Sequence, residues 1–199
     1  MTDEPMTDPA DLPADQPEDE VLDPALAAAV LEIEAHAAES GWDQQGRLFA
    51  LVPTAALVAA EPELARAMGL DAASAEGSFT PVEQELAPGQ VVEEVLGSIM
   101  WPDGVAGCAA IVERYVLPPG ADADIPEDAE QAQAYAAAHP DRQEVRMVAG
   151  VTRAGATYCA LRLRAHDDEQ SVVGGVDLVP ELLEMLQATL DNEDEESGT

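Results

Sequence analysis

The sequence predicts a single α+β domain, with an antiparallel sheet of about five strands and helices packed mainly on one face. Three observations support this fold class. Apolar residues recur at helical spacing in some segments and form short β-branched runs in others. Two of these runs flank residues 153–155, where Gly155 supplies the glycine that a three-residue hairpin loop requires. The length of 199 residues suits one domain with tails, which we place at residues 23–190.

The first half of this domain is expected to alternate helices and strands. Asp23 followed by Pro24 is typical of a helix start, and Ser40-Gly41 of a helix end. A short apolar run that ends at Pro53 predicts a strand, and Thr54 is the expected cap of the next helix. The expected elements are a helix at 24–40, a strand at 47–52, a helix at 54–68, an edge strand at 78–83, a helix at 90–99 and a strand at 105–117.

The second half is expected to hold the hairpin between two helices. An alanine-rich helix at 127–138 should end at His139, because a residue that precedes proline disfavours helical geometry. The strands at 143–152 and 156–165 follow. Asp177 is the expected cap of a final helix. Its apolar face would consist of Val179, Leu182, Leu183, Leu186 and Leu190.

The charge of the chain limits its partners. It has 41 Asp and Glu against 8 basic residues, all of them Arg, and a formal net charge of −33. Such a chain repels phosphates and anionic lipids and attracts basic protein segments, so neither nucleic acid nor a membrane is an expected partner. Residues 1–22 form an acidic, Pro-rich arm and 191–199 an acidic tail, both expected to be disordered. Without a signal peptide or a long apolar run, the expected location is cytoplasmic.

Basic residues concentrate in the predicted hairpin and form a candidate interaction face. The loop geometry places Arg146 opposite Arg162 on the side of the hairpin away from the core. Two facing arginines repel each other unless an acid lies between them. In one alternative, local acids such as Glu113 and residues 167–169 neutralise the pair. In the other, the face receives an acidic segment of a partner. The first alternative is preferred, because surface charges are usually solvated or paired. The face comprises Arg142, Arg146, Arg162 and Arg164.

Two tryptophans and a histidine form a second candidate site. Trp42 and Trp101 each begin a loop after a helix, where such residues plug a core end or line a pocket rim or an interface. His166 precedes three acids, but consecutive residues point in different directions and make a poor metal site. Cys108 and Cys159 are expected to be buried, inert thiols. The sequence has no P-loop, no dinucleotide-binding motif and no nucleophile elbow, so no catalytic residue, cofactor or metal ligand is predicted.

Several stretches together resemble a small, uncharacterised family of acidic actinobacterial proteins. They are VLEIEAHAAESGWDQQGRLFALVPT, TPVEQE, WPDGVAGCA, RQEVRMVAGV, CALRLRAHDDE and DLVPELLEML, and they span about residues 25–190. The resemblance implies no activity and no catalytic residue. The order of elements is also similar to that of secretion-chaperone-like folds, which are small acidic proteins that bind other polypeptides; this is an analogy of fold.

Two functions follow as hypotheses. The first is a non-catalytic cytosolic interaction module, chaperone-like or adaptor-like, that acts as a monomer or homodimer. The second is an enzyme or small-molecule binder with its pocket near Trp42, Trp101 and His166. A close-packed shape without an enclosed polar cleft would favour the first, and a deep pocket that joins these residues would favour the second.

Overall fold

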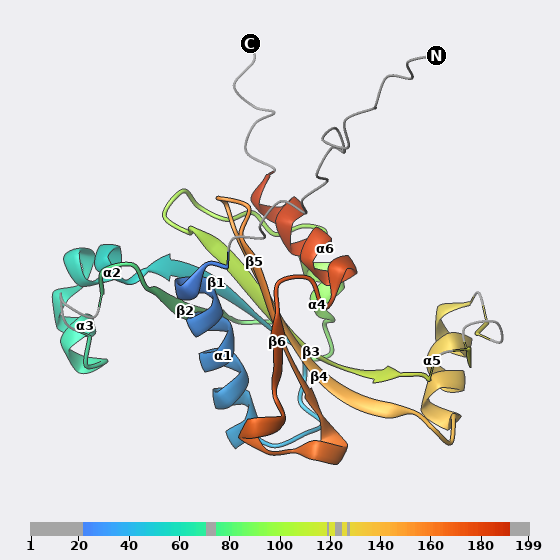
Figure 1. The fold of residues 1–199 in the computed structure, drawn as a ribbon. Helices are drawn as coiled ribbons and strands as arrows, with labels where there is room; N and C mark the ends of the chain where they lie inside the picture. Colours follow the sequence, from blue (N-terminus) through green and yellow to red (C-terminus); the bar gives the residue numbers. More distant parts are fainter. Residues whose placement is uncertain (1–21, 71–74, 119, 122–124, 127, 192–199) are drawn as a thin grey trace, which may run out of the picture.

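A computed structural model of the chain describes residues 22–70, 75–118, 120–121, 125–126 and 128–191 (Figure 1). These residues form an α+β fold around one antiparallel sheet of six strands, in the order β2-β1-β3-β4-β5-β6. Nearly all of the predicted acidic arm (1–22) and acidic tail (191–199) lies outside the described residues.

The helices and strands follow the predicted order, with one additional strand and one divided helix. They are α1 (Pro24–Glu39), β1 (Arg47–Pro53), α2 (Thr54–Ala60), α3 (Pro62–Ala67), β2 (Phe79–Gln84), α4 (Val92–Leu96), β3 (Gly107–Val116), α5 (Ala129–Ala138), β4 (Gln143–Thr152), β5 (Thr157–Leu163), β6 (Val173–Gly175) and α6 (Pro180–Leu190), with two short 3₁₀ helices, η2 (Arg164–His166) and η3 (Glu169–Ser171).

The predicted helix start and hairpin are confirmed at atomic detail. The carboxylate of Asp23 accepts hydrogen bonds from the backbone amides of Ala25 and Leu26, which satisfies two of the free donors at the start of α1. In the hairpin, Gly155 has the left-handed φ of 84° that the third loop position requires. The register that follows pairs Arg146 with Arg162, as expected.

Three local predictions were wrong. The expected helix at 54–68 is two helices, because Pro62 has no amide to donate at that position and starts α3 instead. Asp177 does not cap α6, which begins at Pro180 after Val179. The sheet has six strands rather than about five, because residues 173–175, for which no strand was expected, form the short edge strand β6 paired with β5.

Helices cover both faces of the sheet, which corrects the expectation that they lie mainly on one face (Figure 1). Helices α4 and α6 pack on one face, and the core between these helices and the sheet includes Leu48, Cys108, Ala149 and Leu186. Helix α1 packs on the other face, over Leu51, Ala109, Ile111, Val148 and Ala160. The physical reason is that the central strands are apolar at successive positions, which is typical of strands buried on both sides.

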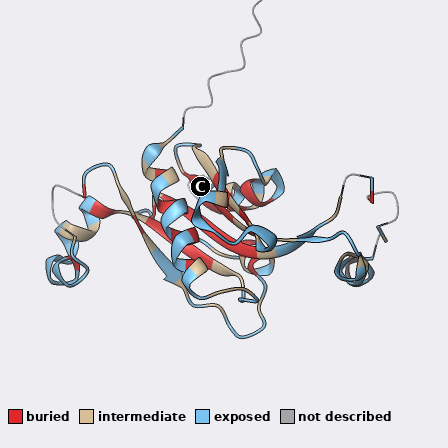
Figure 2. Ribbon diagram, turned by 60° about the horizontal axis from the view of Figure 1, so that its bottom comes forward, coloured by how far each residue is buried: buried red, intermediate tan, exposed pale blue. Residues whose placement is uncertain are grey.

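The contact between α1 and the sheet is close. A Cβ atom added at Gly150 of β4 would lie 2.7 Å from Cγ2 of Val30 and 3.1 Å from Cδ1 of Leu26. The absence of a side chain at Gly150 therefore lets the helix approach the strand. Figure 2 shows the result: buried residues gather in the middle of the sheet and on the inner sides of α1 and α6.

Two parts project from this body in opposite directions (Figure 1). Helices α2 and α3 extend beyond the β1–β2 end of the sheet. Helix α5 stands at the other end, carried by the last residues of β3 and the first residues of β4, which pair through Val116 and Gln143. Both projections are mostly exposed, so the shape of the molecule is a packed centre with two arms (Figure 2).

Candidate functional site

The arginine pair of the hairpin is buried, not exposed. Arg146 and Arg162 are 1% and 3% exposed, because α1 covers the face of β4 and β5 on which they lie. The expectation that this side of the hairpin faces away from the core was therefore wrong. A guanidinium removed from water needs acids and acceptors around it, since an unpaired buried charge is strongly unfavourable.

Glu34 of α1 neutralises Arg162. Its two carboxylate oxygens accept hydrogen bonds from Nε and Nη2 of Arg162, at 2.6 and 2.7 Å. This bidentate bond raises the pKa of Arg162 above its ordinary value. Glu34 was missed by the sequence reasoning, although it left a signal. It lies four residues after Val30, on the apolar face of the helix, where a charged residue predicts a buried partner.

Arg146 lies in the middle of the same network. Its Nη2 donates to Oε1 of Glu113 at 2.9 Å and also to the carbonyl oxygen of Gly41, and its guanidinium lies 4.5 Å from the ring centroid of Trp42. Nη1 of Arg146 is buried and has no hydrogen-bond partner. Among the described residues, it is the one buried side-chain nitrogen or oxygen atom of which this is true. A cavity of about 10 Å³ beside Arg146 approaches the volume that one water needs.

The outer rim of the network is also neutralised. Arg164 donates to both carboxylate oxygens of Asp43 and to Glu144, each at 2.9 Å. The hydrogen bond from Arg164 is the largest cause of a lowered pKa of Asp43. Asp167 approaches Nη1 of Arg162 at 3.5 Å. Glu113 and Asp167, two of the acids expected to bridge the pair, do contact it.

The remaining arginine of the candidate face, Arg142, is exposed and lies 5.4 Å from the ring centroid of Tyr115. Three of the four arginines are therefore held by acids of the same chain, and two of them are buried. The network joins α1, β3, β4, β5 and the loop after α1, so its geometry supports a structural role.

The structure does not bring Trp42, Trp101 and His166 together. Trp42 lies on the α1 side of the sheet and donates from Nε1 to Asp167 at 2.9 Å. Trp101 is buried in the core on the opposite side and donates from Nε1 to Oγ1 of Thr189 at 2.9 Å. His166 is exposed at the end of η2. A pocket lined by all three is excluded because the sheet separates the two tryptophans.

Both cysteines lie in the core beneath α6. Burial raises the pKa of the Cys108 thiol from 9.0 to about 11, and it also raises that of Cys159. Among the described residues, no three His, Cys, Asp or Glu side chains are grouped so that they could hold a metal ion. The cysteines are thus placed for packing rather than for chemistry.

We expect the native thiols to be unreactive at pH 8. A shift from 9.0 to about 11 lowers the thiolate fraction of Cys108 roughly 100-fold, and the fold also blocks access. Dithionitrobenzoate should label neither cysteine before the protein unfolds, and both in guanidinium. Between pH 9 and pH 11, the Cys108 thiol loses its proton in the unfolded chain but keeps it in the folded protein. The free energy of unfolding should therefore fall as the pH rises from 9 to 11. Rapid labelling of the folded protein would contradict the buried placement.

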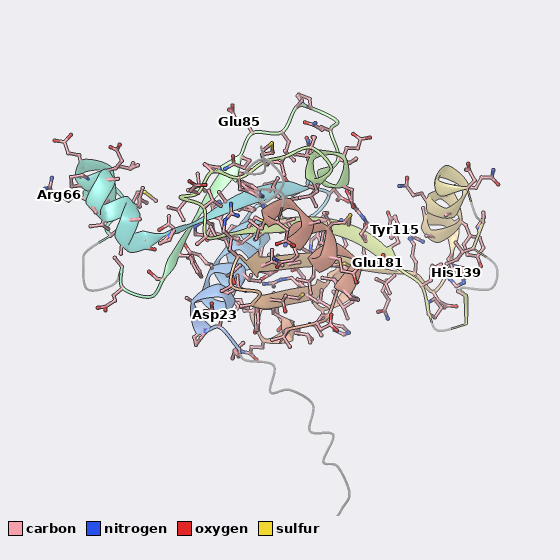
Figure 3. All side chains as sticks on the ribbon, turned by 90° about the horizontal axis from the view of Figure 1, so that it is seen from above. Asp23, Arg66, Glu85, Tyr115, His139 and Glu181 are labelled. Carbon is pink, nitrogen blue, oxygen red and sulfur yellow. The ribbon has the colours of Figure 1, made fainter. Side chains whose placement is uncertain are left out.

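An open groove separates α5 from the body. It has a volume of about 1440 Å³, and it was not expected from the sequence. Tyr115 and Glu181 lie on its body side, and His139 marks the end of α5 across the gap (Figure 3). Of its apolar residues, Tyr115, Val116 and Ile125 are each about 40% exposed. The lining residues are Val91, Glu93, Glu113, Arg114, Tyr115, Val116, Leu117, Ile125, Ala132, Gln133, Ala134, Ala136, Ala137 and Glu181.

Comparison with known proteins assigns the chain to a family. The family described as "PPA1309-like protein" matches residues 26–191, which is most of the chain. This description names no activity, ligand or partner. Searches of curated proteins and of solved structures found no match. In the described part of the chain, no helix is both long enough and apolar enough to cross a membrane.

Proposed function

The chain belongs to the PPA1309-like protein family, and we propose that it is a non-catalytic interaction module of the cytoplasm, adaptor-like or chaperone-like, that acts as a monomer or homodimer. One observation carries this proposal. The groove between α5 and the body exposes apolar side chains, and no described segment fills it. We call it the α5 groove.

The position of α5 supports a binding role. A helix of ten residues is too short to be stable by itself in water, where about 12–15 residues are needed even for alanine-rich sequences. Among the described elements, α5 packs mainly on β3, at the end of the strand that has left the body. A helix held so far from either core contributes little to folding, which favours a role in recognition.

The charged side chains supply a second argument. In an active site, some titratable groups are available to a substrate inside a cleft. Among the described residues, the charged cluster of Glu34, Arg146 and Arg162 is internal, and these side chains bond to each other or to neighbouring residues of the same chain. The open surface of the α5 groove is instead mainly apolar, with nine apolar residues among the fourteen that line it, as in the cores of protein-binding surfaces.

A photo-crosslinking experiment tests the proposed function. Benzoylphenylalanine replaces Val116, which lies in the α5 groove, and in a matched variant it replaces Val173, an exposed valine of the edge strand β6. We expect the Val116 variant to form a discrete cross-linked product with a protein of the source-cell extract, because a partner would pass within reach of the reactive ring. Mass spectrometry then identifies both chains of the product.

The control separates docking from chance encounter. Both sites are exposed β-strand valines, and Val173 is the more exposed at 58% against 39% for Val116, so collisions with abundant proteins should label Val173 at least as strongly. Equal labelling at the two sites, or no product at Val116, would refute the α5 groove as an interaction site.

A further inference from the structure

We propose that the α5 groove takes an amphipathic helix that carries basic residues on its polar side. This inference rests on the proposed function and adds the chemistry of the partner. Three features of the groove support it: the small residues on α5, the exposed apolar residues of the body, and the sign of the charge around them.

The small residues of α5 leave room for a helix. Ala132, Ala136 and Ala137 face the groove, where larger side chains would fill it. Helices pack with their axes 8–10 Å apart, and the shorter distances occur where the contact residues are small. With a rise of 1.5 Å per residue, the part of α5 that lines the groove, from Ala132 to Ala137, forms a wall about 9 Å long, which matches about two turns of a partner helix.

The apolar residues provide the contact surface. Val116 and Tyr115 line the groove from the protruding end of β3, and Val91 lines it from the segment before α4. Val91 is 48% exposed, and Val116 and Tyr115 are of similar exposure. Apolar residues at helical spacing on the partner would cover them, which is the usual way in which an amphipathic helix binds a groove.

The charge of the groove favours a basic partner. Its lining has three acids, Glu93, Glu113 and Glu181, against one base. That base, Arg114, is already paired with Glu93, and Glu113 is bound to Arg146. Glu181 makes no ion pair with any residue that the structure describes and is exposed at the start of α6. An Arg or Lys of the partner would therefore find an available carboxylate there.

The net charge of the whole chain acts in the same direction. At a formal charge of −33, the protein repels an acidic segment and also a second copy of itself, and it attracts a cationic segment. The charge therefore favours a basic partner helix over the two other occupants that the groove could accommodate.

The test uses a fluorescent 14-residue peptide of leucine and lysine, arranged to form an amphipathic helix. Its binding to the full chain is measured by fluorescence anisotropy, with Ala137→Trp as the blocking variant. Ala138→Trp is the matched control, because Ala138 is also exposed on α5 but does not line the groove. We expect Ala137→Trp to weaken binding about tenfold or more, because the indole would occupy space that the peptide helix needs, and Ala138→Trp to leave it within about twofold.

A second pair of variants tests the charge. Glu181→Gln removes the available carboxylate, and Glu184→Gln removes an exposed carboxylate one turn away on α6 that lies outside the groove. Glu181→Gln should weaken binding about threefold more than Glu184→Gln at low salt, and the difference should shrink as salt rises. Equal effects of the two variants would mean that the peptide responds only to the net charge, which would overturn the inference.

Further outcomes separate the inference from the proposed function. If a leucine–glutamate peptide binds as tightly and is sensitive to Ala137→Trp, the groove binds a helix but the basic chemistry is wrong. If sedimentation shows a dimer that Ala137→Trp dissociates, the occupant is a second copy, and the inference fails while the interaction role stands. If Ala137→Trp and Ala138→Trp have the same effect on every peptide and on sedimentation, both the inference and the α5 groove as a docking site are refuted.

Discussion

Replacing Glu34 by alanine is expected to lower the free energy of unfolding by about 3–5 kcal/mol, as loss of one partner of a buried ion pair does. The carboxylate is the bidentate acceptor for Arg162, and Oε1 also lies 4.0 Å from Nη1 of Arg146. Without it, two guanidinium groups face each other beneath α1 with Glu113 as their main remaining acid. Chemical denaturation with urea measures the change.

A matched variant shows whether burial is the cause. Glu32→Ala removes a carboxylate from the same helix, but Glu32 is exposed, so the expected change is within about 0.5 kcal/mol. Replacing Glu34 and Arg162 together by leucine should recover part of the loss, because the uncompensated charge is removed with its partner. A change below about 1 kcal/mol for Glu34→Ala would show that water or another acid reaches the pair.

Replacing Leu186 by alanine is expected to lower the free energy of unfolding by about 2–5 kcal/mol, through lost transfer energy and the cavity left behind. Leu186 is 0% exposed and lies in the core beneath α6. Leu64→Ala on α3 is the control, because it makes the same substitution in a helix at a side chain that is 48% exposed. Thermal and urea denaturation should separate the two variants clearly. Similar losses from both would contradict the placement of α6 on the sheet.

Much of the fold could be predicted because its signals are local. A cap followed by proline at Asp23 and Pro24, and a glycine at the third loop position at Gly155, each determine the backbone within a few residues. The register of the hairpin followed from that loop, which is why Arg146 was correctly placed opposite Arg162. The apolar face of α6 also followed from its spacing, and its leucines at 182, 183, 186 and 190 are buried.

The role of the arginine pair could not be predicted, because it depends on contacts between distant parts of the chain. Arg162 and Glu34 are separated by 128 residues. When the hairpin is considered alone, two arginines on one side indicate that this side faces solvent. The packing of α1 on that side is what buries them. Glu34 among the apolar residues of α1 was a local sign that a charged partner is buried beneath this helix.

The α5 groove escaped prediction for a different reason. The sequence predicted helices packed on the sheet, and nothing in the alanine-rich segment at 127–138 marked it as an exception. The strand β3 continues through the polar residues Glu113 and Arg114 to Tyr115, beyond the apolar positions that the two cores cover. That continuation carries α5 away from the body. How far a strand extends beyond the core depends on how the whole sheet is assembled, so the sequence of the strand alone does not reveal it.

The burial of the sheet on both faces has a consequence for how such a sequence can change in length. Successive residues of β3 and β4 belong alternately to the α6 core and to the α1 core, so inserting or deleting one residue exchanges the two sets. In β4, this would turn Arg146 toward the leucines of α6 and Met147 toward Glu34. Insertions and deletions within the family are therefore expected to accumulate in the two projecting parts, α2–α3 and α5, where a shift of one residue does not exchange the residues of the two cores.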